Sequence, residues 1–124
     1  MSENNLWILT EERPKKKVIQ TIIDKTIKLK KLDLRGIIIT APSLEYDFVS
    51  RFFVPKYGIE EDPVTGSSHT QLTPYWSERL GKSKLQAKQI SARGGVLLCE
   101  QKDNRVLISG SAIKYLEGTI EIKT

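Results

Sequence analysis

Cysteine, histidine and methionine each occur once in this chain of 124 residues, and these shortages exclude several kinds of site. A single cysteine cannot form an internal disulfide, and the apolar run around Cys99 favours a small buried side chain over a nucleophile. One cysteine and one histidine are also too few for a typical zinc site. We therefore expect no metal site.

Long apolar runs are absent as well, because no stretch approaches the ~20 residues that a membrane-spanning helix needs. Residues 1–5 lack the basic-then-apolar order of a signal peptide. We therefore expect a cytoplasmic protein with no membrane partner. The length is that of a single domain, 1–124, which leaves room for a modest core.

The charge is uneven, with 20 Lys and Arg against 15 Asp and Glu and a formal net charge of +5. Seven lysines lie between residues 15 and 31 while the aromatic residues lie elsewhere, so no basic patch is interleaved with rings on which bases stack. This pattern favours a solvated helix face and predicts no nucleic-acid partner. A basic nucleic-acid binder is the weaker alternative, and steep loss of binding with salt would be its signature.

Apolar spacing along the chain predicts an α+β domain. Three- and four-residue spacings predict one helix from Pro14 to about Ile27 and another from Ser67 to Leu80, which Gly81 ends. Strands are expected at 6–10, 36–41, 46–54, 85–92, 96–100 and 105–109, with a last strand at 111–116 and 119–122. Short turns predict hairpins from 36–41 with 46–54 and from 96–100 with 105–109. Strands wrapped around one apolar helix are the favoured architecture.

The second helix has an apolar face and one irregularity. The residues expected to share that face are Leu72, Tyr75, Trp76 and Leu80. Pro74 lies inside the helix, where it lacks an N–H and should kink the helix or remove one hydrogen bond.

The segment 61–69, with the sequence Glu-Asp-Pro-Val-Thr-Gly-Ser-Ser-His, is the one candidate site. Pro63 fixes the backbone beside Asp62, and residues 66–68 open the helix without a bulky side chain. Helix N-termini carry free N–H groups and partial positive charge, so an anion can bind there next to the carboxylate. The side chains that add hydrogen-bond donors are Thr65, Ser67, Ser68 and His69. A carboxylate beside a bound anion suits general acid or base work.

A helix cap is the competing interpretation of the same residues. Asp, Ser and Thr before a helix usually accept hydrogen bonds from its first N–H groups, and Asp-Pro is common in turns. A lone histidine in a first helical turn is also commonly structural or exposed. The residue pattern alone leaves the cap and the anion site open.

Several separated motifs of the chain resemble one known family. They lie, in order, at 47–53, 58–69, 74–82, 91–95, 109–112 and 116–119. They resemble the hallmarks of the phenazine-biosynthesis F-like (PhzF-like) proteins, within the diaminopimelate epimerase superfamily, and the similarity runs from about Arg35 to Ile122. The resemblance implies one half of a diaminopimelate epimerase-like fold, a β-roll or open barrel wrapped around a central helix. Such proteins resemble two similar halves with the active site between them.

The resemblance also implies a reaction class and roles for the loop. Family members are cofactor-independent isomerases or epimerases that move a proton next to a carboxylate. By resemblance, Asp62 is the catalytic proton-exchanging residue, and the substrate-binding residues are Thr65, Gly66, Ser67, Ser68 and His69. Gly66, Ser67 and Ser68 would hold a carboxylate through helix-end amides. Thr65 stands where the epimerase relatives carry a catalytic cysteine, so two-cysteine racemase chemistry is not expected.

The resemblance matches the C-terminal half of the family only, because the N-terminal half with its principal acid–base glutamate has no counterpart here. We therefore expect the C-terminal half of an isomerase acting on a small carboxylate-containing substrate. It would be inactive as a lone monomer, and its partner would be a second copy in a homodimer or a separate N-terminal-half chain. A truncated or degraded gene and a split enzyme are both consistent with this length. The alternative function is a non-catalytic small-anion-binding or interaction module, a remnant of the enzyme.

Overall fold

The computed structural model describes residues 5–9, 21, 36–54 and 59–124, and within them strands surround a helix. The elements in chain order are β1 (Asn5–Leu9), β2 (Gly36–Pro42), β3 (Phe48–Val54), β4 (Ile59–Asp62), α2 (Gly66–Leu80), β5 (Lys84–Gln89), β6 (Gly95–Lys102) and β7 (Arg105–Ser109). This confirms the predicted α+β class. The helix predicted from Pro14 to Ile27 lies, except for Thr21, outside the described residues.

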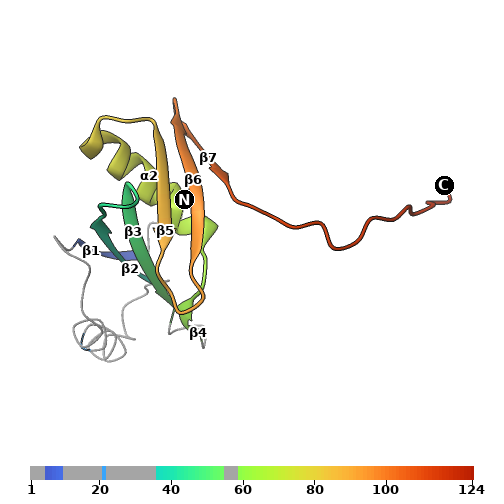
Figure 1. Ribbon diagram of the computed structural model, residues 1–124, viewed down its shortest axis with the longest axis horizontal. Coiled ribbons are helices and arrows are strands. Elements are labelled where there is room, and N and C mark those ends of the chain that lie inside the picture. Colours follow the sequence, from blue (N-terminus) through green and yellow to red (C-terminus); the bar gives the residue numbers. More distant parts are fainter. Residues whose placement is uncertain (1–4, 10–20, 22–35, 55–58) are drawn as a thin grey trace.

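The described strands form one mixed sheet in the order β1-β2-β3-β5-β6-β7, with β4 paired to β3 beside β5 (Figure 1). Both predicted hairpins are confirmed, since β2 pairs antiparallel with β3 and β6 pairs antiparallel with β7. β3 and β5 are parallel neighbours, and the chain between them passes through β4 and α2. Because a crossover helix starts near the carboxyl ends of parallel strands, the start of α2 lies near the end of β5.

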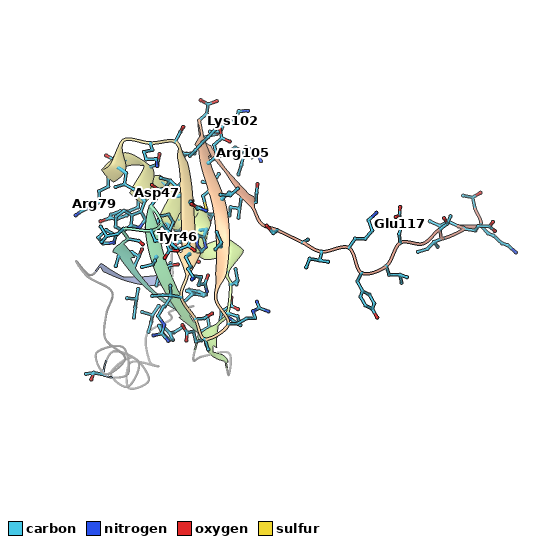
Figure 2. The ribbon with its side chains drawn as sticks, in the orientation of Figure 1. Tyr46, Asp47, Arg79, Lys102, Arg105 and Glu117 are labelled. Atoms are coloured by element: carbon cyan, nitrogen blue, oxygen red, sulfur yellow. The ribbon has the colours of Figure 1, made fainter. Side chains whose placement is uncertain are left out.

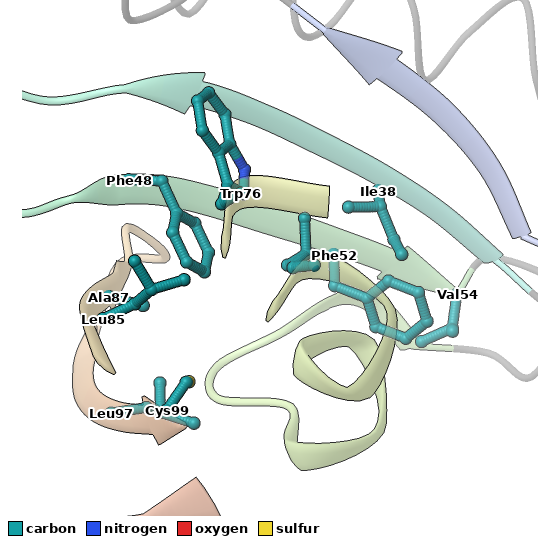
Figure 3. Packing of buried hydrophobic residues seen from close by; sticks show 10 residues of the cluster. Ile38, Phe48, Phe52, Val54, Trp76, Leu85, Ala87, Leu97 and Cys99 are labelled. Carbon is teal, nitrogen blue, oxygen red and sulfur yellow. The ribbon is translucent and has the colours of Figure 1, made fainter. Parts of the chain in front are cut away.

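The core lies between α2 and one face of the sheet (Figure 3). Alternate residues of β3, β5 and β6 face the helix, as the two-residue period of a strand requires. Trp76 anchors this packing: its ring stacks on Phe48 with centroids 5.6 Å apart, and its Nε1 donates to Thr40 Oγ1 at 3.0 Å. Buried aromatic side chains of this size dominate the energetics of a small core.

The helix α2 buries the stripe Ser68, His69, Leu72, Thr73 and Trp76. The prediction that Leu80 shares the buried face is wrong, since 39% of Leu80 is exposed at the last turn. The helix continues through Pro74, which lies on its exposed side. Gly81 ends it with a φ of 65°, a left-handed conformation that favours glycine, and its N–H donates to the Ser77 carbonyl.

Several expected strands differ from the structure by one or two residues at their ends, and two expectations differ by more. β5 ends at Gln89 rather than Ala92, because the chain turns at 91–93 before β6. The last strand expected at 111–116 and 119–122 is wrong for this structure, in which residues 110–124 are assigned to no strand and lead away from the sheet beyond β7 (Figure 1). Among the described residues no helix combines the length and apolarity that crossing a membrane requires.

Candidate active site

The position of Asp62 is fixed by the pairing of β4 with β3. Asp62 is the last residue of β4 and lies opposite Phe52 in the register. One residue earlier, Glu61 accepts two hydrogen bonds from Arg51, at 2.6 Å from Nε and 2.7 Å from Nη2. Both side chains of this ion pair are largely buried, with 20% and 18% exposed. Bidentate pairing of this kind constrains direction as well as distance, so it holds β4 against β3 just before Asp62.

Thr65 uses its hydroxyl on Asp62 rather than as a helix cap. Thr65 is at the N-cap position of α2 with an extended backbone, but its side chain makes no capping hydrogen bond. Its Oγ1 instead donates to Asp62 Oδ2 at 2.5 Å. The cap interpretation is therefore wrong for Thr65. The first turn of α2 also carries no acidic side chain that would offset the positive end of the helix dipole.

Gln89, which was not predicted as a site residue, holds the turn from Asp62 to Thr65 through hydrogen bonds. It is fully buried at the end of β5. Its Oε1 accepts from the Thr65 N–H at 2.7 Å, and its Nε2 donates to the Asp62 carbonyl at 2.7 Å and to Thr65 Oγ1 at 3.0 Å. The signal available in the sequence was a polar residue at a buried strand position, which normally needs partners. Three hydrogen bonds from one amide fix both ends of the Asp62–Thr65 turn.

The turn between β5 and β6 supports the same loop from the side. Ser91 Oγ donates to the Pro63 carbonyl at 2.7 Å and accepts from the Gly94 N–H at 2.9 Å. A Cβ placed at Gly95 would collide with the Val64 side chain, so only glycine permits this close approach. The segment 91–95, which carries part of the family resemblance, therefore packs against the 62–65 loop and supports it.

The start of α2 separates the remaining predicted residues into two groups. Gly66 and Ser67 are exposed next to half-buried Asp62, and a Cβ at Gly66 would meet open space. Ser68 and His69 are buried behind them. Ser68 Oγ donates to the Thr65 carbonyl at 3.2 Å. Of the predicted site residues, Asp62, Gly66 and Ser67 are therefore the ones that reach the surface.

His69 is held inside the protein in one tautomer. Its Nδ1 lies 2.6 Å from the Thr65 carbonyl oxygen, which can only accept, so Nδ1 carries the proton. Its Nε2 is buried and has no partner among the described residues. Burial lowers the pKa of His69, although the hydrogen bond to the Thr65 carbonyl opposes this shift. In this arrangement His69 supports the turn, and its predicted contact with a ligand stays a prediction.

Two hollows of the described surface lie away from the candidate site. A groove of about 640 Å³ runs between the turns at 42–46 and 90–94, on Val49, Lys88 and Ile90. A second, of about 620 Å³, lies over the strands β5 to β7. None of the predicted site residues lines either of these two hollows. Within the described ranges no cluster of three metal-ligating side chains occurs. Burial raises the pKa of the Cys99 thiol.

A mixed sheet packed on one helix, with the Asp62 turn at the start of that helix, defines the described part of the chain as an α+β domain. The sequence pattern of the phenazine biosynthesis-like protein family (PhzC-PhzF) matches residues 2–118. The chain belongs to this family.

Relatives and solved structures agree with this assignment. An uncharacterized isomerase of Pseudomonas aeruginosa is 49% identical over 86% of this chain and 41% of its own length. Phenazine biosynthesis-like domain-containing protein 2 of Mus musculus is also 49% identical, over 79% of this chain and 35% of its own. The crystal structure of a phenazine biosynthesis PhzC/PhzF protein from Clostridium difficile superposes with a TM-score of 0.74 at 46% identity, covering 98% of this chain and 46% of that one. The chain thus spans less than half the length of these relatives.

Proposed function

We propose that this chain is the C-terminal half of a cofactor-independent isomerase or epimerase that acts next to a carboxylate of a small acid. The observation that carries the proposal is the Asp62–Thr65–Gln89 arrangement at the start of α2. The Asp62 carboxylate accepts a hydrogen bond from the Thr65 hydroxyl, and the buried Gln89 amide fixes that hydroxyl in turn. A carboxylate fixed in this way keeps one direction, as a proton-transfer group requires. The isomerase relative among the matched proteins supports this reaction class.

The carboxylate of the substrate would bind at the N-terminus of α2. Thr65 does not cap this end, and exposed Gly66 leaves room for close approach. The partial positive charge and the backbone N–H groups of a helix start favour a carboxylate there. Asp62, half-buried at the edge of this position, would then exchange a proton with the carbon next to that carboxylate.

Epimerisation removes a proton from one face of a carbon and returns one to the opposite face, which a single carboxylate does not reach. Glu61, the neighbouring carboxylate, is committed to Arg51. We therefore propose that a second polypeptide surface closes the site, supplied by another copy or by a separate N-terminal-half chain, and that a lone monomer has little activity. This leaves a second candidate function, a small-anion-binding or interaction module without turnover.

Two measurements test both candidates. The first is titration of ¹⁵N-labelled protein with sodium acetate and sodium benzoate against sodium chloride at equal ionic strength. We expect carboxylate-specific shifts of the Gly66, Ser67 and Ser68 amides in the wild type and in Asp62→Asn. Shifts that chloride reproduces would contradict a carboxylate site.

The second measurement is deuterium uptake from D₂O at the carbon next to the carboxylate, followed by ¹H NMR over a panel of small carboxylic acids. The isomerase candidate predicts uptake that Asp62→Asn abolishes while the folded spectrum is retained. Carboxylate binding without uptake, at all protein concentrations tested, would favour the binding module. Uptake that survives in Asp62→Asn would refute the role of Asp62.

A further inference from the structure

The last fifteen residues, 110–124, form an extended C-terminal arm that leaves the body of the protein after β7 (Figure 1). Its large apolar side chains are almost fully exposed, at 96% for Ile113, 99% for Tyr115, 83% for Leu116, 86% for Ile120 and 83% for Ile122. Contiguous apolar surface of this extent marks an interaction site in a soluble protein. The arm therefore needs a partner surface.

The sequence pattern of the arm continues that of β7. Ile108 packs against the core on the helix side of the sheet, while Leu107 pairs with Glu100 and faces outward. With a period of two, even-numbered positions stay on the helix side, and those with apolar side chains there are Val106, Ile108, Ala112, Leu116, Ile120 and Ile122. Odd-numbered positions near the end are polar, at Thr119, Glu121 and Lys123. Ile113 and Tyr115 fall at odd positions and Lys114 at an even one, so the pattern of one apolar and one polar face holds for residues 116–123 of the arm.

The chain also carries an edge that such a strand fits. In the described sheet β7 is the last strand and pairs with β6 on one side alone. An edge strand presents unpaired N–H and C=O groups to any added strand. The arm runs on beyond β7 instead of turning back along it (Figure 1), so within one copy the edge and the arm do not meet.

We propose that two copies of this chain associate by exchanging arms, each arm adding as an antiparallel strand to the β7 edge of the other copy. The continuous segment 105–121 is complementary to itself in a register centred on Ile113. In that register Arg105 lies opposite Glu121 and Val106 lies opposite Ile120, while Ile113 meets its own copy. Opposite charges and apolar pairs across antiparallel strands both stabilise pairing. Figure 2 shows Arg105 at the start of β7, where the partner's Glu121 would reach it.

A second copy is favoured over an unrelated partner because both required surfaces are present in one chain. A two-fold dimer uses each contact twice, residue for residue, and pairs each arm with the β7 edge of the other copy. The inference stands apart from the proposed chemistry, because it uses none of the residues at the start of α2.

The test is sedimentation equilibrium of the full chain over a wide concentration range, with three kinds of variant. The wild type is expected to shift from 14.1 kDa to twice that mass. Ile120→Lys should weaken dimerisation at least tenfold, because the substitution places a charge opposite Val106. Thr119→Lys adds the same charge on the polar face and should change the dimerisation affinity less than threefold, on the order of a single cross-strand pair. Ile120 is exposed in the single copy, so its substitution leaves the folded body intact.

A charge exchange tests the register itself. Arg105→Glu should weaken the dimer by roughly three- to tenfold because two like-charge pairs arise, and Arg105→Glu with Glu121→Arg should restore it. A wild type that stays at 14.1 kDa at millimolar concentration overturns the proposal. Equal weakening by Ile120→Lys and Thr119→Lys, or no recovery in the charge exchange, also overturns it, because association would then use another surface.

Discussion

Replacing Gln89 by leucine tests whether a buried amide holds the candidate site together. The substitution keeps approximate size and removes three hydrogen bonds that join β5 to the Asp62–Thr65 turn. Two backbone groups lose their partner, the Thr65 N–H and the Asp62 carbonyl. Leaving a buried polar group unsatisfied costs about 1–3 kcal/mol.

The two losses differ in size because the two groups differ in burial. Thr65 is 6% exposed, so its N–H has no access to water, whereas the half-buried Asp62 allows water to reach its carbonyl. We therefore expect a decrease of about 2–4 kcal/mol in the free energy of unfolding. With an unfolding entropy of about 2.1 cal/mol/K per residue, a chain of 124 residues would lose about 8–15 °C in Tm.

The matched control is Gln86→Leu, the same substitution on the exposed face of the same strand. Chemical denaturation and thermal melting give the stability of both variants, and amide NMR shows whether the Thr65 and Gly66 signals move in Gln89→Leu alone. If the two variants melt together, the clamp contributes nothing and the argument for a fixed Asp62 is refuted.

Two further predictions concern the contact of Gly95 with Val64 and the buried His69. Gly95→Ala should lower the free energy of unfolding by about 1–3 kcal/mol because the new methyl group collides with Val64. Adding Val64→Ala should recover part of this loss, as measured by urea denaturation. An unchanged midpoint for Gly95→Ala would show that the contact is not tight. His69 has a pKa below its ordinary 6.5, so the unfolded chain binds this proton first as the pH falls. Its contribution to stability is present above pH 6.5 and is lost as the pH falls from there toward the folded pKa. His69→Asn should remove that part of the slope of Tm between about pH 7.5 and about pH 5, and an identical slope in both proteins would show that His69 does not titrate differently on folding.

Local patterns predicted much of the fold because their physics acts within a few residues. The alternation in 46–54 and the apolar run in 36–41 gave the β2–β3 hairpin, and Gly81 ended α2 as its left-handed conformation requires. The same local reasoning failed at Leu80, which is apolar and has the right spacing but lies beyond the sheet that would cover it. Local patterning also predicted a strand at the C-terminus, where no neighbouring strand lies within the described part of one copy.

The candidate site shows the same division. The loop 61–69 and the family resemblance identified Asp62 and the start of α2 from sequence alone, because an Asp-Pro turn and a Gly-Ser helix start are local features. The sequence left open whether Thr65 caps the helix, and the structure assigned its hydroxyl to Asp62.

By itself the sequence determined the class of the fold, the family and the position of one carboxylate beside a helix start. The tertiary structure alone decided that Gln89, 24 residues after Thr65, bonds the Thr65 hydroxyl and the backbone of the Asp62–Thr65 turn. This depends on the parallel pairing of β3 with β5, which no local period encodes. The order of strands in the sheet decides which distant polar groups meet. The edge of β3 could pair with any strand of suitable pattern, and the packing of α2 selects β5 as its neighbour. The same reason explains why Gly66 and Ser67 face outward while His69 faces the core.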